Sequence, residues 1–263
     1  MKKEIILPPP VPATPSLESQ ITDLAQRYNE ARGVGMQLLG LIGSKADTLL
    51  DRLPRPAKDA LDVTTLRALE ASFDTAAKSR DLMPDTSNWL TRAVTMSTGA
   101  AGGVGGLPTA LAELPVTTTI LLRAIQGIAS DYEFDVRDAD TRADCLQVFA
   151  AAGPLNDDDG TDLAFLSLKV SLTGASLQKL IATVAPKLAL VMGQKLATQT
   201  VPVLGAVAGA ATNYVFTSYY QDMAHVQFGL RRLAEDTGHD RAALIERLRV
   251  EIESKRAAKL NLL

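Results

Sequence analysis

Two long stretches of this chain are apolar but built mainly from small side chains. Residues Ala93–Ile128 and Val184–Tyr220 consist largely of Gly, Ala, Val, Leu and Thr, interrupted by single prolines. Both approach or exceed the roughly 20 apolar residues that a membrane-spanning helix needs. Either these stretches enter a membrane, or they pack as closely spaced helices inside a bundle. This choice limits the folds that are open to the chain.

Charged and polar side chains argue against simple membrane crossing. Glu113 and Arg123 fall within reach of the centre of the first stretch, where a charge costs about 2.5–3.5 kcal/mol, whereas each Leu, Ile or Val returns only about 0.3–0.6 kcal/mol. The second stretch has helix-breaking, polar or charged residues within it or at its borders: Lys187, Lys195, Pro202, Asn213 and Asp222. A helical hairpin or monotopic insertion therefore competes with a packed soluble core.

The composition and spacing of the chain predict helices throughout. Aromatic residues make up 5% of the chain and hydrophobic residues 46%, so the core must be aliphatic and rich in alanine. Such a core favours packed helices over sheets. Helical spacing is clear at Ile21, Leu24, Ala25 and Tyr28, and no run of alternating strands with hairpin turns is present. We predict an all-α, multi-helix bundle with two proline-kinked, Gly/Ala-rich central segments and no significant β-sheet.

Proline and turn signals divide the chain into three predicted regions. These are a disordered Pro-rich arm over 1–16, an N-terminal helical region over 17–84 and the main helical domain over 85–263. Helices are expected from residue 17, with a kink or break among the glycines of 33–43, and then over about 62–79, 89–96, 115–130, 138–152, 163–172, 176–200, 202–236 and 240–260.

Charge, cysteine content and the N-terminal residues narrow the functional classes. A net charge of −3 gives no electrostatic basis for nucleic-acid binding. Cys145 is the single cysteine, which excludes an intramolecular disulfide and is typical of a reducing compartment. The first residues lack an apolar core of useful length before the prolines, so a secretory signal is not expected. We expect a cytoplasmic protein.

Catalytic and cofactor motifs are weak. The glycine stretch over 99–106 lacks the following Lys-Ser/Thr and the preceding strand of a nucleotide-binding loop. Asp222 and His225 share one helix face, where the carboxylate could fix the imidazole tautomer, and Glu113 could add a third group for acid–base or metal chemistry. A surface or intrahelical Asp–His pair is the simpler interpretation. We predict no cofactor and no bound metal.

Four sequence blocks together resemble a known family. They are Glu113–Ile125, Asp140–Gly153, Val201–Asn213 and Tyr219–His225, the last followed by Phe228 and Arg231-Arg232. In this order, over roughly residues 85–240, they are similar to the EcsC protein family. The resemblance implies a bacterial, mainly helical protein whose namesake is encoded with an ABC exporter. It supplies no catalytic residue set.

The motif positions define a candidate polar cluster or functional surface. Its members are Glu113, Pro115, Thr117, Arg123, Pro202, Asn213, Asp222, His225 and Arg231. Because Glu113 and Arg123 are ten residues apart, one straight helix would not pair them. Each needs a partner on another helix, and Asp222 is available for Arg123 and Arg231 for Glu113.

Three functions remain open at this point. The first is a non-enzymatic helical protein on the cytoplasmic membrane face, peripheral or monotopic, whose partner is the membrane surface or a membrane protein such as an ABC transporter. The second is a soluble helical scaffold or homo-oligomer. The third is an unrecognised hydrolase-type enzyme, which requires Glu113, Asp222 and His225 to converge in one pocket.

Overall fold

The computed structural model describes residues 15–42, 50–82, 111–155, 163–167, 174–199 and 205–260. These residues form helices, and no strand occurs among them. In chain order the elements are α1 (Leu17–Ile42), the 3-10 helix η1 (Leu50–Arg52), α3 (Arg55–Leu82), a helical segment over 111–131, α5 (Ala139–Val148), the 3-10 helix η2 (Ala164–Ser167), α6 (Gly174–Gln199), α7 (Gly205–Thr237) and α8 (Arg241–Leu260). The all-α prediction is confirmed.

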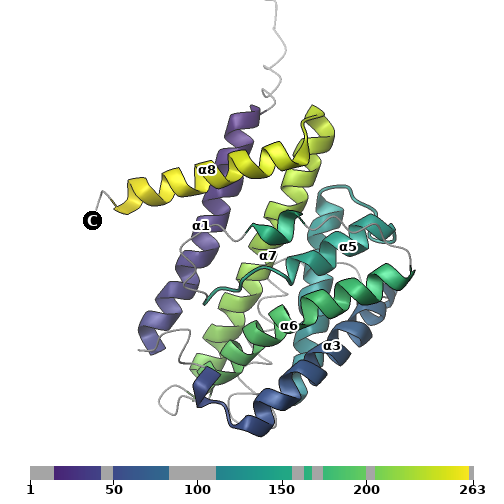
Figure 1. Cartoon of the computed structure of the whole chain (residues 1–263), viewed down its shortest axis with the longest axis vertical. Helices are drawn as coiled ribbons and strands as arrows, with labels where there is room; N and C mark the ends of the chain where they lie inside the picture. Colours follow the sequence, from purple (N-terminus) through teal and green to yellow (C-terminus); the bar gives the residue numbers. More distant parts are fainter. Residues whose placement is uncertain are drawn as a thin grey trace, which may run out of the picture.

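The long helix α7 runs through the middle of the bundle (Figure 1). It contacts α1, α5, α6 and α8, while α3 packs against α6. α1 lies alongside α7, and α8 crosses α1 and the upper part of α7 (Figure 1). Elements from the two ends of the described chain therefore lie side by side.

The core is aliphatic, as its composition predicts, and its few aromatic rings gather around α7. Tyr219, Tyr220, Phe216 and Phe228 of α7 are fully buried. The ring of Tyr220 contacts Phe149 edge-on, with centroids 5.3 Å apart. Such edge-to-face pairs add stabilisation beyond the burial of their area. The central helix thus carries the largest buried side chains.

α1 continues through Gly33 and Gly35, so the break expected there is absent at these two glycines, and the alternative of a kink stays a prediction. At Gly35 an added Cβ would overlap the carbonyl oxygen of Pro154. This glycine therefore permits a close backbone approach between α1 and residue 154 and does not end the helix. Tertiary packing overrides the weak local preference of glycine against helix.

α3 begins at Arg55, seven residues before the predicted start at Asp62. The carbonyl of Pro54 accepts hydrogen bonds from the amides of Ala57 and Lys58. A proline in the first turn has no amide that needs an intrahelical partner, so Pro56 fits this helix start. The Pro54-Arg55-Pro56 segment therefore lies at the start of α3.

Pro115 lies inside the helical segment over 111–131, and not at the start of a helix as predicted. The hydroxyl of Thr119 donates to the Pro115 carbonyl at 2.8 Å. α6 also contains an internal proline, Pro186. Whether these prolines kink their helices stays a prediction.

Helix ends in the C-terminal part follow their local signals. Gly238 has a φ of +69°, a conformation that glycine adopts easily, and it directly follows α7. A side-chain oxygen of Asp240 accepts from the amide of Ala243 at the start of α8. Leu244, Leu248 and Ile252 of α8 are buried. The boundary predicted between the helices over 202–236 and 240–260 is confirmed.

Several predictions lie outside the described residues. They concern residues 1–14 of the Pro-rich arm, the helix over 89–96, the glycine stretch over 99–106 and Pro202. The division of the chain into three regions also stays a prediction.

One helix of the described part is long and apolar enough to cross a membrane, judged by length and composition alone. It covers Leu177–Thr198 in α6, and 72% of its most apolar stretch is buried inside the protein. A core helix of a soluble bundle meets the same test. The predicted stretch Val184–Tyr220 is divided between α6 and α7.

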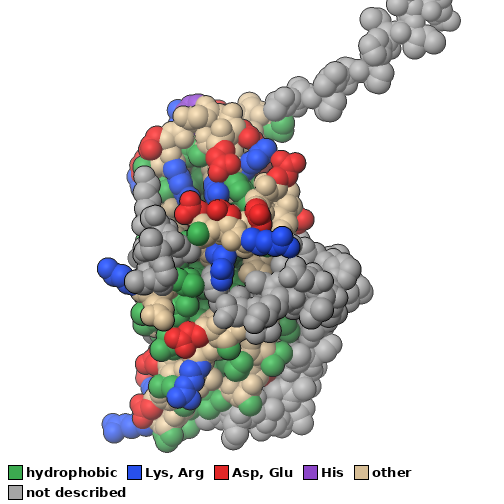
Figure 2. Space-filling view, turned by 90° about the vertical axis from the view of Figure 1, so that its right-hand side faces the viewer, with side chains coloured by type: hydrophobic (Ala, Val, Ile, Leu, Met, Phe, Trp, Pro, Cys, Tyr) green, Lys and Arg blue, Asp and Glu red, His purple; other side chains and the backbone are tan. Residues whose placement is uncertain are grey.

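Acidic and basic side chains are intermixed on the face of the protein shown in Figure 2, and hydrophobic side chains lie between them in its lower half. Charged side chains of the described residues also pair along one helix, such as Arg249 with Glu246 and Glu253 on α8. Exposed pairs of this kind contribute about 0–1 kcal/mol each. The stability of the bundle therefore depends mainly on its core.

Candidate functional site

Three motif residues, Glu113, Thr117 and Asn213, meet Lys195 in a buried polar group, which we call the Glu113 cluster. Glu113 Oε1 accepts hydrogen bonds from Thr117 Oγ1 at 3.0 Å, from Asn213 Nδ2 at 3.1 Å and from Lys195 Nζ at 3.3 Å. Lys195 Nζ also lies 3.5 Å from Thr117 Oγ1. The cluster joins the segment over 111–131 to α6 and α7.

Helical spacing places these groups. Glu113 and Thr117 are one turn apart and so share a helix face. Close by, the hydroxyls of Thr198 on α6 and Thr212 on α7 lie 3.1 Å apart and extend the polar contact between these two helices. Each polar side chain thus finds a partner on a different helix.

The Glu113–Lys195 ion pair is almost fully removed from water. The side chains of Lys195 and Glu113 are 3% and 9% exposed. Burial lowers the pKa of Lys195, because it penalises the charged ammonium, and the Glu113 carboxylate opposes this shift. A buried pair of this kind is costly to break, because either partner alone would be an uncompensated charge. The cluster is suited to fixing three helices relative to one another.

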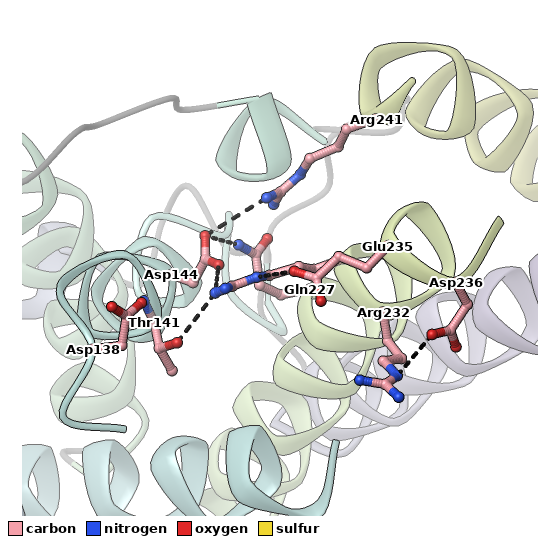
Figure 3. Close-up of polar contacts among 9 residues, drawn as sticks. Asp138, Thr141, Asp144, Gln227, Arg232, Glu235, Asp236 and Arg241 are labelled. Carbon is pink, nitrogen blue, oxygen red and sulfur yellow. Dashed lines mark hydrogen bonds and ion pairs between the residues drawn. The ribbon is translucent and has the colours of Figure 1, made fainter. Parts of the chain in front are cut away.

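A second buried carboxylate joins α5, α7 and α8 (Figure 3). Asp144 Oδ1 accepts from Gln227 Nε2 at 2.7 Å and lies 3.8 Å from Arg241 Nη1, while Oδ2 accepts from Arg231 Nη1 at 2.9 Å. Burial raises the pKa of Asp144, and the charges of Arg241 and Arg231 oppose this rise. We call Asp144, Gln227, Arg231 and Arg241 the Asp144 cluster.

Arg231 makes several contacts at once within this cluster. Its Nη1 also donates to Thr141 Oγ1 at 3.2 Å, and its Nε donates to Glu235 at 3.1 Å. Its guanidinium lies 4.2 Å from the centre of the Phe134 ring, a cation–π contact. Contacts on several sides hold the guanidinium in one position.

The predicted Arg231–Glu113 pair is wrong. Asn213, which contacts Glu113, and Arg231 are 18 residues apart on α7, a helix rise of about 27 Å. Glu113 pairs with Lys195 instead, and Arg231 with Asp144 and Glu235. The adjacent Arg232 pairs with Asp236, one turn later on α7, at 3.1 Å.

Glu113, Asp222 and His225 do not converge. Asp222 pairs with Arg27 of α1 at 2.8 Å, and the ring of His225 packs edge-on against Tyr132 with centroids 5.8 Å apart. Nine residues separate Asp222 from Asn213 on α7, a rise of about 13 Å. The hydrolase hypothesis, which needs these three groups in one pocket, loses its geometric basis.

The other predicted residues have separate positions. The carbonyl of Pro115 also accepts from the hydroxyl of Ser72 on α3 at 3.4 Å. Arg123 is half-buried in the segment over 111–131, and its pairing with Asp222 stays a prediction. Pro202 lies outside the described residues. Within the described ranges, no group of three His, Cys, Asp or Glu side chains could hold a metal ion.

Sequence reasoning did not select Lys195, Asp144, Gln227 or Arg241 as site residues. The sequence could have indicated Lys195, because it is a charged residue in the mostly apolar run of α6 and a buried charge needs a partner. Asp144 lies within one of the four family-like blocks. Gln227 and Arg241 had no comparable signal.

The family assignment comes from comparison with known proteins. The model of the EcsC protein family matches residues 65–233, which include both clusters except Arg241. Protein EcsC of Bacillus subtilis (strain 168) is 28% identical over 151 residues, which are 55% of this chain and 60% of that protein. The match therefore spans less than two thirds of this relative. No solved structure matches the chain. Since the family model covers more than half of the sequence, the chain belongs to the EcsC protein family.

Proposed function

We propose that this protein is a non-enzymatic helical protein that works at the cytoplasmic face of the membrane, as an accessory to an ABC-type transport or secretion system. The observation that carries the proposal is the composition of α6. This helix is long and apolar enough to cross a membrane, and it contains three lysines but no Asp or Glu. Basic and apolar helices favour the anionic surface of a bilayer.

The two buried clusters support a structural role over catalysis. The Glu113 and Asp144 carboxylates are each engaged by a cationic side chain and a side-chain amide. Each cluster bridges three helical segments, as expected of groups that fix the helices of a bundle. The link to an ABC-type exporter comes from the family resemblance.

A soluble scaffold or homo-oligomer is the second candidate. It is favoured by the burial of 72% of the most apolar stretch of α6. In that case the small and apolar side chains of α6 serve helix packing alone.

Cell fractionation and vesicle flotation separate the two candidates. For the membrane-face function we expect the full chain to sediment with membranes, to be released at least in part by a carbonate wash, and to float with vesicles of bacterial lipids. Protein that stays wholly soluble and ignores vesicles would refute it. A discrete assembly in detergent-free buffer, measured by size exclusion with light scattering, would then favour the scaffold.

The exporter link has its own test. Membranes solubilised in a mild detergent are applied to the tagged protein, and the eluate is examined for the ATPase and membrane subunits of an ABC exporter. The link predicts that these subunits co-purify in a fixed ratio. If the protein binds membranes but the exporter subunits do not co-purify with it, the exporter link is refuted and only the membrane-surface function remains.

A further inference from the structure

We propose that the exposed face of α6 is the surface that docks on the membrane, and that its partner is the anionic surface of a lipid bilayer. This inference rests on the proposed function and names its docking element. The exposed residues recur at helical spacing along the first two thirds of the helix. We call them the α6 stripe: Lys179, Ala182, Thr183, Pro186, Lys187 and Leu190.

The stripe is basic within an acidic protein. The whole chain has a net charge of −3, whereas α6 carries three lysines and no acidic residue. Lys195 points inward to Glu113, which leaves Lys179 and Lys187 on the outside. A positively charged face of this kind attracts the phosphates of anionic lipids.

Neither of the two outward lysines pairs with a carboxylate of the described residues. Across the described ranges, neither Lys179 nor Lys187 forms an ion pair. By contrast, Lys58, Arg249 and Lys255 all pair with carboxylates on the surface. No ion pair within the described residues therefore competes with an external anion for these two charges.

On the neighbouring helix α3, the described acidic side chains do not neutralise the stripe through ion pairs. α3 packs against α6 and exposes Asp59, Asp62 and Glu70. In the described part of the chain, none of these three forms an ion pair with Lys179 or Lys187. Screening by salt weakens the remaining attraction across longer distances.

The stripe also has the side chains that a bilayer interface accepts. Leu190 is 49% exposed although it is a large apolar residue. Between the lysines lie the small or uncharged Ala182, Thr183 and Pro186, and the lysine stems can extend along an apolar surface while their ammonium groups reach the phosphates. From Lys179 to Leu190 the stripe is about 16 Å long.

Docking along the stripe requires no rearrangement of the bundle. The opposite face of α6 stays in the core, where Val184, Leu188 and Met192 are buried, and the Glu113–Lys195 pair holds its C-terminal part. Membrane crossing is disfavoured, because Lys187 lies near the middle of Leu177–Thr198, where a charge is most costly. The geometry thus favours a helix that lies on the surface.

Flotation with two kinds of vesicle tests the stripe directly. The full chain is mixed with vesicles of phosphatidylcholine alone or of phosphatidylcholine with phosphatidylglycerol. The variant Lys179→Gln/Lys187→Gln should bind the anionic vesicles roughly 30-fold more weakly than the wild type, from the usual effect of two lysines at an anionic surface. The variant Leu190→Gln should weaken binding to both kinds of vesicle.

A matched control separates the stripe from overall charge. The variant Lys58→Gln/Lys255→Gln removes the same charge from α3 and α8, and it should bind close to wild-type level. Equal binding of the stripe variant and the wild type, or equal loss in the control, would overturn the inference. Circular dichroism and thermal unfolding confirm that the variants fold, as expected for exposed positions.

The outcome also separates this inference from the function on which it rests. Wild-type protein that floats while the stripe variant floats equally well leaves the membrane-face function in place and assigns docking to another surface. Wild-type protein that binds neither kind of vesicle and is wholly soluble in cells removes both.

Discussion

Replacing Lys195 with methionine removes one charge from the Glu113 cluster and leaves the other buried. Lys195 supplies one of the three hydrogen bonds to Glu113 Oε1, and its side chain is 3% exposed, so water cannot readily take its place. Breaking one partner of a buried ion pair costs about 3–5 kcal/mol. Because Thr117 and Asn213 still donate to Glu113, we expect the lower end, about 3 kcal/mol. For a chain of this size, that lowers Tm by about 6–12 °C.

Urea and thermal unfolding of matched variants measure this cost. Lys187→Met changes an exposed lysine on the same helix and should stay within about 0.5 kcal/mol of the wild type. The double variant Glu113→Gln/Lys195→Met should cost less than the sum of its two single variants, because it leaves no unpaired charge. A Lys195→Met variant as stable as Lys187→Met, or single costs that simply add, would refute the reasoning.

Three further predictions concern other sites. Burial raises the pKa of Asp144, so the stability that this group contributes is greatest at a pH below its usual pKa of 3.8 and declines as the pH rises through the folded-state pKa. In unfolding experiments across this pH range, the wild type should lose stability relative to Asp144→Asn as the pH rises. A difference between the two proteins that stays constant with pH would contradict this prediction. Gly35→Ala should destabilise the protein by about 1–3 kcal/mol or more, because the new Cβ would meet the Pro154 carbonyl. Gly33→Ala, which has open space around it, should stabilise the protein by about 0.5–1 kcal/mol. Equal effects of the two variants in urea unfolding would disprove the close approach of α1 to residue 154. Arg27→Ala breaks a partly exposed ion pair with α7 and should cost at most about 1 kcal/mol in the same assay, so a larger loss would contradict a surface pair.

Local signals in the sequence were sufficient for the end of α7 and the start of α8. Gly238 adopts the left-handed conformation that follows many helices, and Asp240 caps the next one. The buried positions of α8 follow directly from its apolar spacing. These features depend on neighbouring residues alone, so the sequence contains all the information that they need.

The partners of the buried charges could not be predicted in the same way. Glu113, Thr117 and Asn213 were among the predicted site residues and contact one another in the structure, but Glu113 pairs with Lys195 and not with Arg231. That choice depends on which helices are neighbours and at which height they meet. Gly35 shows the same limit, because only the position of Pro154 explains why α1 continues through it. The spacing of residues along one helix predicts neither the pairing of Glu113 with Lys195 nor the approach of Pro154 to Gly35.

The pairing of α1 with α8 has a consequence for how the protein can be divided. Both helices lie outside residues 65–233, which match the family, yet each packs on α7 and on the other. Leu24 of α1, for example, approaches so closely that a Cβ on Gly229 would lie 2.8 Å from its side chain. A fragment trimmed to the family boundaries would uncover one flank of the central helix, and we expect such a fragment to aggregate. The segment that matches the family is thus shorter than the segment that folds as one cooperative unit.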